Sequence, residues 1–189
     1  VAVAELGDPD TIACAAQGCE VVFHCAGIAS ARAHPRALDW VNVAGTENVV
    51  IAAREVGVRR VVVLSCADVS LHNADRIHWG EGRVVTVAPI DAHARSKLLA
   101  EEVALSKSDK RLEVTAVRPA WIWGPGDHTT LPGLCAEAAS GGIRLHGSGE
   151  NLFAAVHIDN LVPALIAAAT ATKAPGNAYY VADSDVLTA

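Results

Sequence analysis

Three apolar runs constrain the fold of this chain more than any other feature. They are EVVFHCAG at 20–27, RRVVVLS at 59–65 and LEVTAVRP at 112–119. Long unbroken stretches of Val and Leu are typical of strands that are buried on both faces of a sheet. Apolar residues recur at helical spacing from Trp40 to Val56 and from Ile90 to Ser106. Strands that alternate with helices in this way predict a parallel sheet covered by helices on both faces.

The other predicted elements are shorter. They are a strand at 1–5, a helix at 8–18, a helix at 130–140, strands at 153–158 and 177–183, and a helix from Asp159 to about Thr172. Asp159 is expected to be the N-cap of that last helix. In the helix at 90–106, Leu98, Leu99 and Val103 are expected on one side, and Glu101 and Glu102 on the other. The segment 71–90 is expected to be irregular, with a small strand at RVVTV.

Charge and hydropathy argue against two classes of partner. The net charge of −6 and the shortness of every basic run argue against nucleic-acid binding. Although 51% of the residues are hydrophobic, no uninterrupted apolar stretch approaches the roughly 20 residues that span a bilayer. Membrane insertion is therefore not expected, and a small molecule is the expected partner.

Cysteines and histidines give further expectations. The five cysteines are an odd number without a CxxC pair, which favours reduced thiols and a cytoplasmic location. The spacings of His72, His78 and His93 match no zinc pattern, so no metal site is expected. The chain has no methionine, even at position 1, and no signal peptide is recognisable, so both ends are expected to be truncations of a longer protein.

Five motifs then occur in a specific order. They are VNVAGTENVV at 41–50, VVVLSCADVS at 61–70, HARSK at 93–97, RPAWIWGPGD at 118–127 and FAAVHIDNL at 153–161. In this order they resemble the extended short-chain dehydrogenase/reductase family. Within that family the chain is most similar to the NAD-dependent epimerase/dehydratase and 3β-hydroxysteroid dehydrogenase branch. The resemblance covers nearly the whole chain, and five spaced motifs are far more specific than one.

The resemblance implies a fold and an activity. The expected fold is a doubly wound, Rossmann-like α/β sheet that lacks its first strand-helix-strand unit. Residues 1–189 would form a single incomplete NAD(P)-binding domain, with part of a small substrate lobe at about 124–157. The implied chemistry is NAD- or NADP-dependent oxidation, reduction or epimerisation at a hydroxyl or keto carbon of a steroid-like or nucleotide-sugar substrate.

The resemblance also implies roles for individual residues. Lys97 would hold the coenzyme ribose and lower the pKa of a tyrosine one helical turn before it. His93 stands at that tyrosine position, and Cys66 stands at the position of the catalytic Ser or Thr. Trp121 and Trp123 either pack in the core or line the substrate pocket. The remaining residues expected to bind the coenzyme are Glu5 and Leu6 at the adenine, His24, Cys25, Ala26, Gly27 and Ser65 along its length, and Pro119 and Ile122 at the nicotinamide.

Two departures from the family pattern predict weak or absent activity. Imidazole is shorter than the phenol that it replaces, and a thiol is a weak hydrogen-bond donor. No sequence in the chain matches the glycine-rich turn that binds the coenzyme pyrophosphate at a helix N-terminus. A non-catalytic, degenerate dehydrogenase that serves as a binding or regulatory module, or has no function, is the alternative. Asn42 is expected to be structural and to bond backbone groups near the start of its helix.

The absent unit has a structural consequence. In the family's sheet order the missing strands would separate the strand at 1–5 from the strand at 20–27. We therefore expect VAVAE to pair directly with VVFHCA, or two copies of the chain to form a homodimer through that edge.

Overall fold

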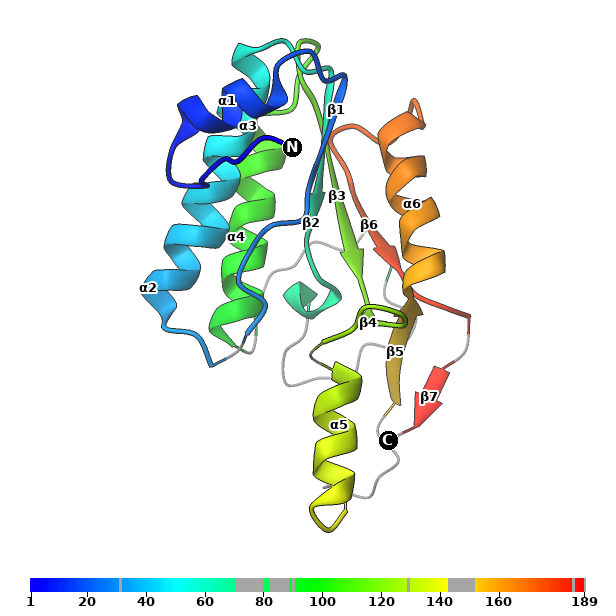
Figure 1. Cartoon of the computed structure of the whole chain (residues 1–189). Coiled ribbons are helices and arrows are strands. Elements are labelled where there is room, and N and C mark those ends of the chain that lie inside the picture. The colour runs from blue at the N-terminus through cyan, green and yellow to red at the C-terminus, as the bar shows by residue number, and fades with distance from the viewer. Residues whose placement is uncertain are drawn as a thin grey trace.

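The main sheet is built from the three predicted apolar runs and the last predicted strand. The structure, a computed structural model, describes residues 1–30, 32–70, 80–81, 89, 91–128, 130–142, 152–184 and 186–188. Strands β1 (Val21–His24), β2 (Arg60–Leu64), β3 (Glu113–Pro119) and β6 (Ala178–Val181) lie in the order β1-β2-β3-β6 (Figure 1). All three pairings are parallel. The predicted parallel α/β sheet is confirmed.

Helices cover both faces of this sheet (Figure 1). One face carries α1 (Pro9–Ala16), the continuous helical stretch α2 (Pro35–Leu38), η1 (Asp39–Ala44, a π-helix) and α3 (Gly45–Glu55), and α4 (Ala92–Ser106). The other face carries α6 (Ile158–Thr170). Val61 and Val63 pack with the first group, whereas Val62 packs beneath α6. This alternation, with every residue buried, explains why the strand is apolar at successive positions.

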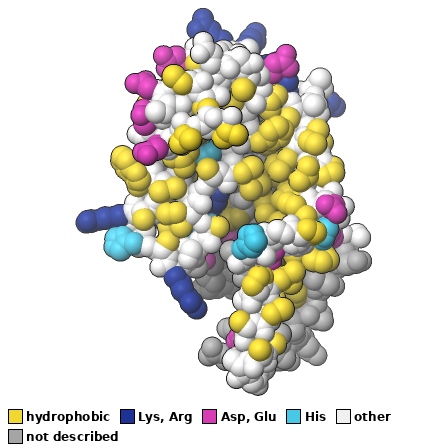
Figure 2. Space-filling view, in the orientation of Figure 1, with side chains coloured by type: hydrophobic (Ala, Val, Ile, Leu, Met, Phe, Trp, Pro, Cys, Tyr) yellow, Lys and Arg dark blue, Asp and Glu magenta, His cyan; other side chains and the backbone are white. Residues whose placement is uncertain are grey.

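A second, three-stranded sheet contains β4 (Trp121–Trp123), β5 (Leu152–His157) and β7 (Val186–Thr188), in the order β4-β5-β7. The strand β4 pairs with β5 in parallel, and β5 pairs with β7 antiparallel. Helix α5 (Thr130–Ala139) extends from the body near this sheet, and a short 3₁₀ helix η2 (Ala67–Ser70) follows β2 (Figure 1). Figure 2 shows hydrophobic side chains gathered over β1 and α6 and again along α5.

The starts of α1 and α4 agree with the sequence patterns, whereas the helical stretch predicted from Trp40 begins at Pro35, with His34 as its cap. Asp8 caps α1, and the Asp91 carboxylate accepts a hydrogen bond from the Ala94 N–H at the start of α4. The predicted N-cap Asp159 is wrong, because that residue lies in the first turn of α6. His157 is the cap, and its Nδ1 accepts a hydrogen bond from the Asp159 N–H at 3.2 Å. A neutral imidazole nitrogen can satisfy a free helical N–H just as a carboxylate can.

The prediction of a strand at 1–5 is also wrong. Residues 1–5 form no strand, and Val1 and Val3 are exposed. The Glu5 N–H bonds instead to the Thr11 hydroxyl, and the Glu5 carbonyl accepts from the Asp8 N–H. A β-rich composition gives no strand without a neighbour that pairs with its backbone. The pairing of VAVAE with VVFHCA is therefore absent, and association of two copies through β1 stays a prediction.

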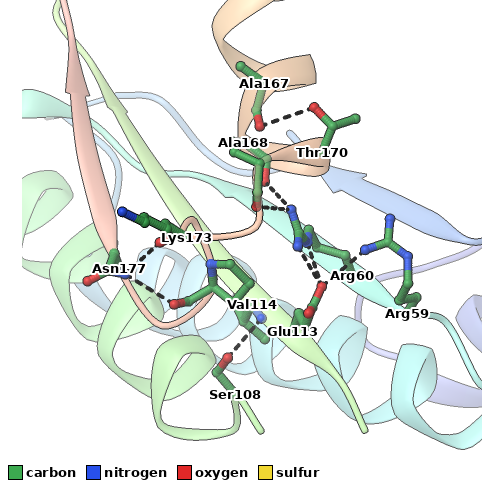
Figure 3. Close-up of polar contacts among 12 residues, drawn as sticks. Arg59, Arg60, Ser108, Glu113, Val114, Ala167, Ala168, Thr170, Lys173 and Asn177 are labelled. Carbon is green, nitrogen blue, oxygen red and sulfur yellow. Dashed lines mark hydrogen bonds and ion pairs between the residues drawn. The ribbon is translucent and has the colours of Figure 1, made fainter. Parts of the chain in front are cut away.

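The end of the sheet at which the strands begin is held together by a buried arginine. Arg60 lies on β2, and its guanidinium contacts the Glu113 carboxylate and the carbonyls of Ala168 and Ala171 at the end of α6 (Figure 3). Its side chain is only 3% exposed. Arg60 thus satisfies terminal carbonyls of α6 that have no partner within the helix.

Some predictions fall on residues that the structure does not describe. These are the small strand RVVTV and the histidines His72 and His78. Within the described residues, no group of three or more His, Cys, Asp or Glu side chains could hold a metal ion. The described helices also include none that is long and apolar enough to cross a membrane.

Candidate active site

Lys97 lies at the end of β2, where the strands of the main sheet finish. Its amine donates a hydrogen bond of 2.9 Å to the carbonyl oxygen of Leu64, the last residue of β2. Burial lowers the pKa of the amine below its ordinary value, while the nearby thiols of Cys66 and Cys25 act in the opposite direction. The carboxyl ends of parallel strands are where open α/β sheets bind ligands. The position of Lys97 therefore agrees with a role in ligand binding.

The loop after β1 passes directly in front of this amine. A Cβ atom added to Gly27 would lie 3.4 Å from the Lys97 Nζ and 2.9 Å from the Asn42 Oδ1. The backbone of the next residue, Ile28, bonds at both N–H and C=O to the Asn42 side chain. Cys25, Ala26 and Gly27 are exposed. The loop thus presents an open backbone surface beside Lys97, and only glycine fits at position 27.

Asn42 also ties this loop to α4. Its amide nitrogen donates to the Ser96 hydroxyl at 2.9 Å, and that hydroxyl donates to the His93 carbonyl at 2.7 Å. The prediction that Asn42 bonds backbone near the start of its own helix is wrong, because its side chain bonds the backbone of Ile28 in the loop after β1. The link to Ser96 was not predicted, because residue type alone does not reveal a partner far away in the sequence.

His24, at the end of β1, is buried beside the same loop. Its Nε2 lies 2.9 Å from the Thr46 hydroxyl, which itself donates to the Asn42 carbonyl. The imidazole is therefore the donor of the His24–Thr46 bond. Burial, and then the charge of Lys97, lower the pKa of His24 to about 4. His24 is thus a neutral, inward-facing residue, and Thr46 was not among the predicted site residues.

His93 and Ser65 place polar atoms in the site that have no partner. The His93 Nε2 and the Ser65 hydroxyl are both buried without a hydrogen bond to any described residue. Burial and the charge of Lys97 lower the pKa of His93, while the carboxylates of Asp91 and Asp68 raise it. Buried polar atoms without partners are rare in folded proteins. Two of them, directly after β2 and in the first turn of α4, favour a ligand-binding site near Lys97.

Cys66 contributes a protonated thiol. Burial, followed by the charge of Asp68, raises its pKa to about 12, against the opposing effect of Lys97. A thiol of this kind is a poor nucleophile near neutral pH. The sulfur could act only as a weak hydrogen-bond donor.

The aromatic residues of β4 are not core residues. Trp121 and Trp123 are 50% and 41% exposed, and they meet Phe153 and His157 edge-on. Trp123 lines a cavity of about 330 Å³, together with Ile122, Gly124, Pro125, Gly126, Asp127, His128 and Ile158. Of the two predicted roles for the tryptophans, the exposure disfavours core packing.

The remaining predicted residues lie partly in this region and partly outside it. Pro119 ends β3 and is buried. Leu6 packs against Gly45, three residues after Asn42, while Glu5 is exposed. The site residues on β1, β2 and α4 are therefore gathered around Lys97. The contacts of Glu5 and Leu6 lie instead at α1 and at the start of α3.

Comparisons with known proteins show what the chain is similar to. The chain is 33% identical to a 2-alkyl-3-oxoalkanoate reductase of Stenotrophomonas maltophilia, over 97% of this chain and 57% of that protein. It is 32% identical to human sterol-4-alpha-carboxylate 3-dehydrogenase (decarboxylating), over 82% of this chain and 42% of that protein. The chain thus spans about half the length of these relatives.

A solved structure gives a similar result. A double mutant of DesIV, a dTDP-glucose 4,6-dehydratase from Streptomyces venezuelae with NAD bound, superposes with a TM-score of 0.84 at 26% identity. The match covers 98% of this chain and 58% of that one. A family model described as "3-beta hydroxysteroid dehydrogenase/isomerase family" matches residues 1–187. This chain, whose motifs resemble the extended short-chain dehydrogenases/reductases, belongs to the 3-beta hydroxysteroid dehydrogenase/isomerase family.

Proposed function

We propose that this chain forms the catalytic end of an NAD(P)-dependent oxidoreductase that acts on a hydroxyl or keto carbon. The proposed substrate is a steroid-like compound or a nucleotide sugar. Residues at about 124–157 are proposed to contribute to the lobe that binds this substrate. The observation that carries the proposal is the amine of Lys97, fixed at 2.9 Å on the Leu64 carbonyl beside the loop of Gly27.

The described residues fit the nicotinamide-ribose end of the coenzyme. Gly27 lets the loop backbone pass close to Lys97 and Asn42, and the Ser65 hydroxyl is buried without a partner among the described residues. Lys97 would bind ribose hydroxyls, and Pro119 and Ile122 would line the nicotinamide. When bound, the coenzyme supplies hydride transfer to or from the reacting carbon.

His93 is proposed to handle the proton of the substrate hydroxyl. Because its pKa is lowered, the imidazole is neutral near pH 7 and can accept a proton. That state suits oxidation of the hydroxyl, whereas reduction needs the imidazolium. Cys66 would donate a weak hydrogen bond to the substrate oxygen. We propose that turnover is poorer than with a tyrosine, because the shorter imidazole must reach the same oxygen.

The alternative, a non-catalytic member of the family, is favoured by the same His93 replacement. Both functions keep Lys97 as a ligand-binding residue, but only the first requires hydride transfer. Reduction of NAD or NADP in the presence of a hydroxylated substrate therefore separates them.

Titration with NADH and NADPH, followed by coenzyme fluorescence, tests the binding role. We expect the unchanged chain to bind the coenzyme with a dissociation constant of about 1 mM or weaker, because its sequence contains no glycine-rich pyrophosphate turn. We expect the Lys97→Met variant to bind the coenzyme about tenfold more weakly still. Lys107→Met, at the end of α4, is the matched control. Equal affinity of the chain and of Lys97→Met would overturn the assignment of Lys97. Micromolar binding would contradict the importance given to the glycine turn.

A further inference from the structure

A buried ion pair joins α4 to the main sheet one helical turn from Lys97. The Arg118 guanidinium on β3 contacts both Glu101 carboxylate oxygens, with Nη2 at 2.5 Å and Nε at 3.0 Å. The two side chains are 9% and 3% exposed. The third guanidinium nitrogen, Nη1, donates to the Tyr180 hydroxyl of β6 at 3.0 Å, and the guanidinium carbon lies 5.0 Å from the centroid of the Tyr180 ring.

The sequence pattern had put Glu101 opposite the apolar side of α4, together with Glu102. That prediction is wrong for Glu101, which is buried, and right for Glu102, which is exposed. An acidic residue in a helix normally faces water, because burial of an unpaired carboxylate is strongly unfavourable. Arg118 supplies the missing partner, and its identity could not be read from the local periodicity of α4.

The ion pair and the Lys97 contact attach α4 to neighbouring points of the sheet. Lys97 and Glu101 are four residues apart, so they share a helix face. Leu64, which accepts the Lys97 hydrogen bond, pairs in register with Val117, and Arg118 is the next residue on β3. Two polar contacts one turn apart thus join the helix to adjacent residues of two paired strands.

The rest of the buried face of α4 is made of small residues. They are Ala94, Ser96, Ala100 and Ala104. Small side chains let the helix approach the sheet closely, but they interdigitate little and define its rotation and axial position weakly. A bidentate guanidinium–carboxylate pair is directional, with a fixed fork geometry. The buried pair is therefore suited to fix the helix that carries Lys97.

Stability alone gives no reason for such a pair. Replacement of a buried ion pair by apolar residues of similar volume is often neutral or stabilising, because both charges must be desolvated. Such a pair can instead fix the position of the helix on the sheet, which apolar packing does less well. The position concerned here is that of the Lys97 amine.

We propose that Glu101 and Arg118 are positioning residues that hold Lys97 at the end of β2, with Tyr180 fixing the guanidinium from the other side. This inference rests on the proposed function in one respect only, namely that Lys97 binds the coenzyme. Its test measures Lys97 itself, without coenzyme or substrate.

The decisive variant is Glu101→Gln, read by NMR titration of the labelled Lys97 side chain. Loss of the Glu101 charge, with Lys97 unmoved, would lower the Lys97 pKa, because a nearby negative charge stabilises the ammonium. Release of Lys97 into water would raise its pKa toward the ordinary value. The proposal predicts a rise in pKa and loss of the slowly exchanging ammonium protons, so the two explanations differ in sign.

Val114→Ala is the matched control, since Val114 is a buried residue of β3 in the core cluster that also holds Ala104 of α4, and it takes no part in the ion pair. It destabilises the fold without touching the pair, and the Lys97 pKa should not change. A lowered or unchanged pKa in Glu101→Gln, or the same rise in Val114→Ala, would overturn the proposal.

Tyr180→Phe is a second variant, which removes only the hydroxyl partner of Arg118. We expect a smaller rise in the Lys97 pKa in the same direction, and no rise would count against the proposal even if Glu101→Gln fails to fold. Because none of these measurements uses coenzyme, failure of the proposed function and failure of this inference are distinguishable.

Discussion

The Lys97 amine and the Leu64 carbonyl form a 2.9 Å hydrogen bond between α4 and the end of β2. The charge of Lys97 lowers the pKa values of both His24 and His93. We therefore expect Lys97→Met to raise both histidine pKa values, as measured by NMR titration of the imidazole carbon-bound protons. Lys107→Met is the control, and unchanged values in Lys97→Met would contradict the placement of the amine.

Stability should fall as the pH falls from about 6.5 to about 4. His24 has a folded-state pKa of about 4, against an ordinary value of 6.5, so the unfolded chain binds the proton first. The stability lost through this window is about 3 kcal/mol. Urea denaturation at a series of pH values measures it. His24→Gln, which removes this titration, should flatten the profile. His128→Gln, at an exposed histidine, is the control, and equal profiles for both variants would refute the assignment.

His93→Tyr with Cys66→Ser introduces the residues that the resemblance to the family implies at these two positions. If a longer form of the chain binds coenzyme, this double variant should increase turnover, because a phenol reaches further and a hydroxyl is a better donor than a thiol. Steady-state kinetics in both directions measure the effect. Absence of any gain would remove the assignment of these two positions to catalysis.

Gly27→Ala should destabilise the protein by about 1–3 kcal/mol, because the new Cβ would lie too close to the Asn42 carboxamide oxygen. Gly133→Ala is the matched control. Gly133 lies in α5, where no atom stands within 4 Å of an added Cβ. Alanine is there the better helix former, so this variant should be neutral or stabilising. Urea denaturation compares the two, and similar losses would contradict the tight packing at Gly27.

Arg60→Met should cost about 1–3 kcal/mol of stability, because it leaves the buried carbonyls at the end of α6 and the partly exposed Glu113 carboxylate without this partner. Arg59→Met should change stability by no more than about 1 kcal/mol, because the Arg59–Glu113 ion pair is exposed. Urea denaturation again gives both values. Comparable effects of the two variants would show that burial does not distinguish these arginines.

The sequence predicted the parts of the structure that depend on local pattern and on general rules of sheet topology. The spacing put Lys97 and His93 one turn apart on a helix, but it was the resemblance to the family that implied a place for both at the coenzyme site. Local pattern predicted the main-sheet strands, since β2 has successive apolar residues that are buried on both faces.

The errors at residues 1–5 and at Glu101 concern partners that are distant in sequence, whereas the error at Asp159 is local. Val1 and Val3 favour a strand, but no described strand pairs with them. Glu101 was placed with Glu102 on the polar side of α4, because Arg118 lies on a different element and could not be foreseen as its partner. Asp159 is a good helix-capping residue, but the cap is the preceding His157, whose ring nitrogen was not considered.

Arg60 and Lys97 occupy opposite ends of the same sheet, and this separation has a practical consequence. Substitutions near the start of β2 should allow thermostability to be tuned over several kilocalories per mole without a change in ligand affinity. A library of variants that aims at new ligand specificity can therefore be confined to the end of the sheet near Lys97. The parent protein for that library can first be stabilised by substitutions near Arg60.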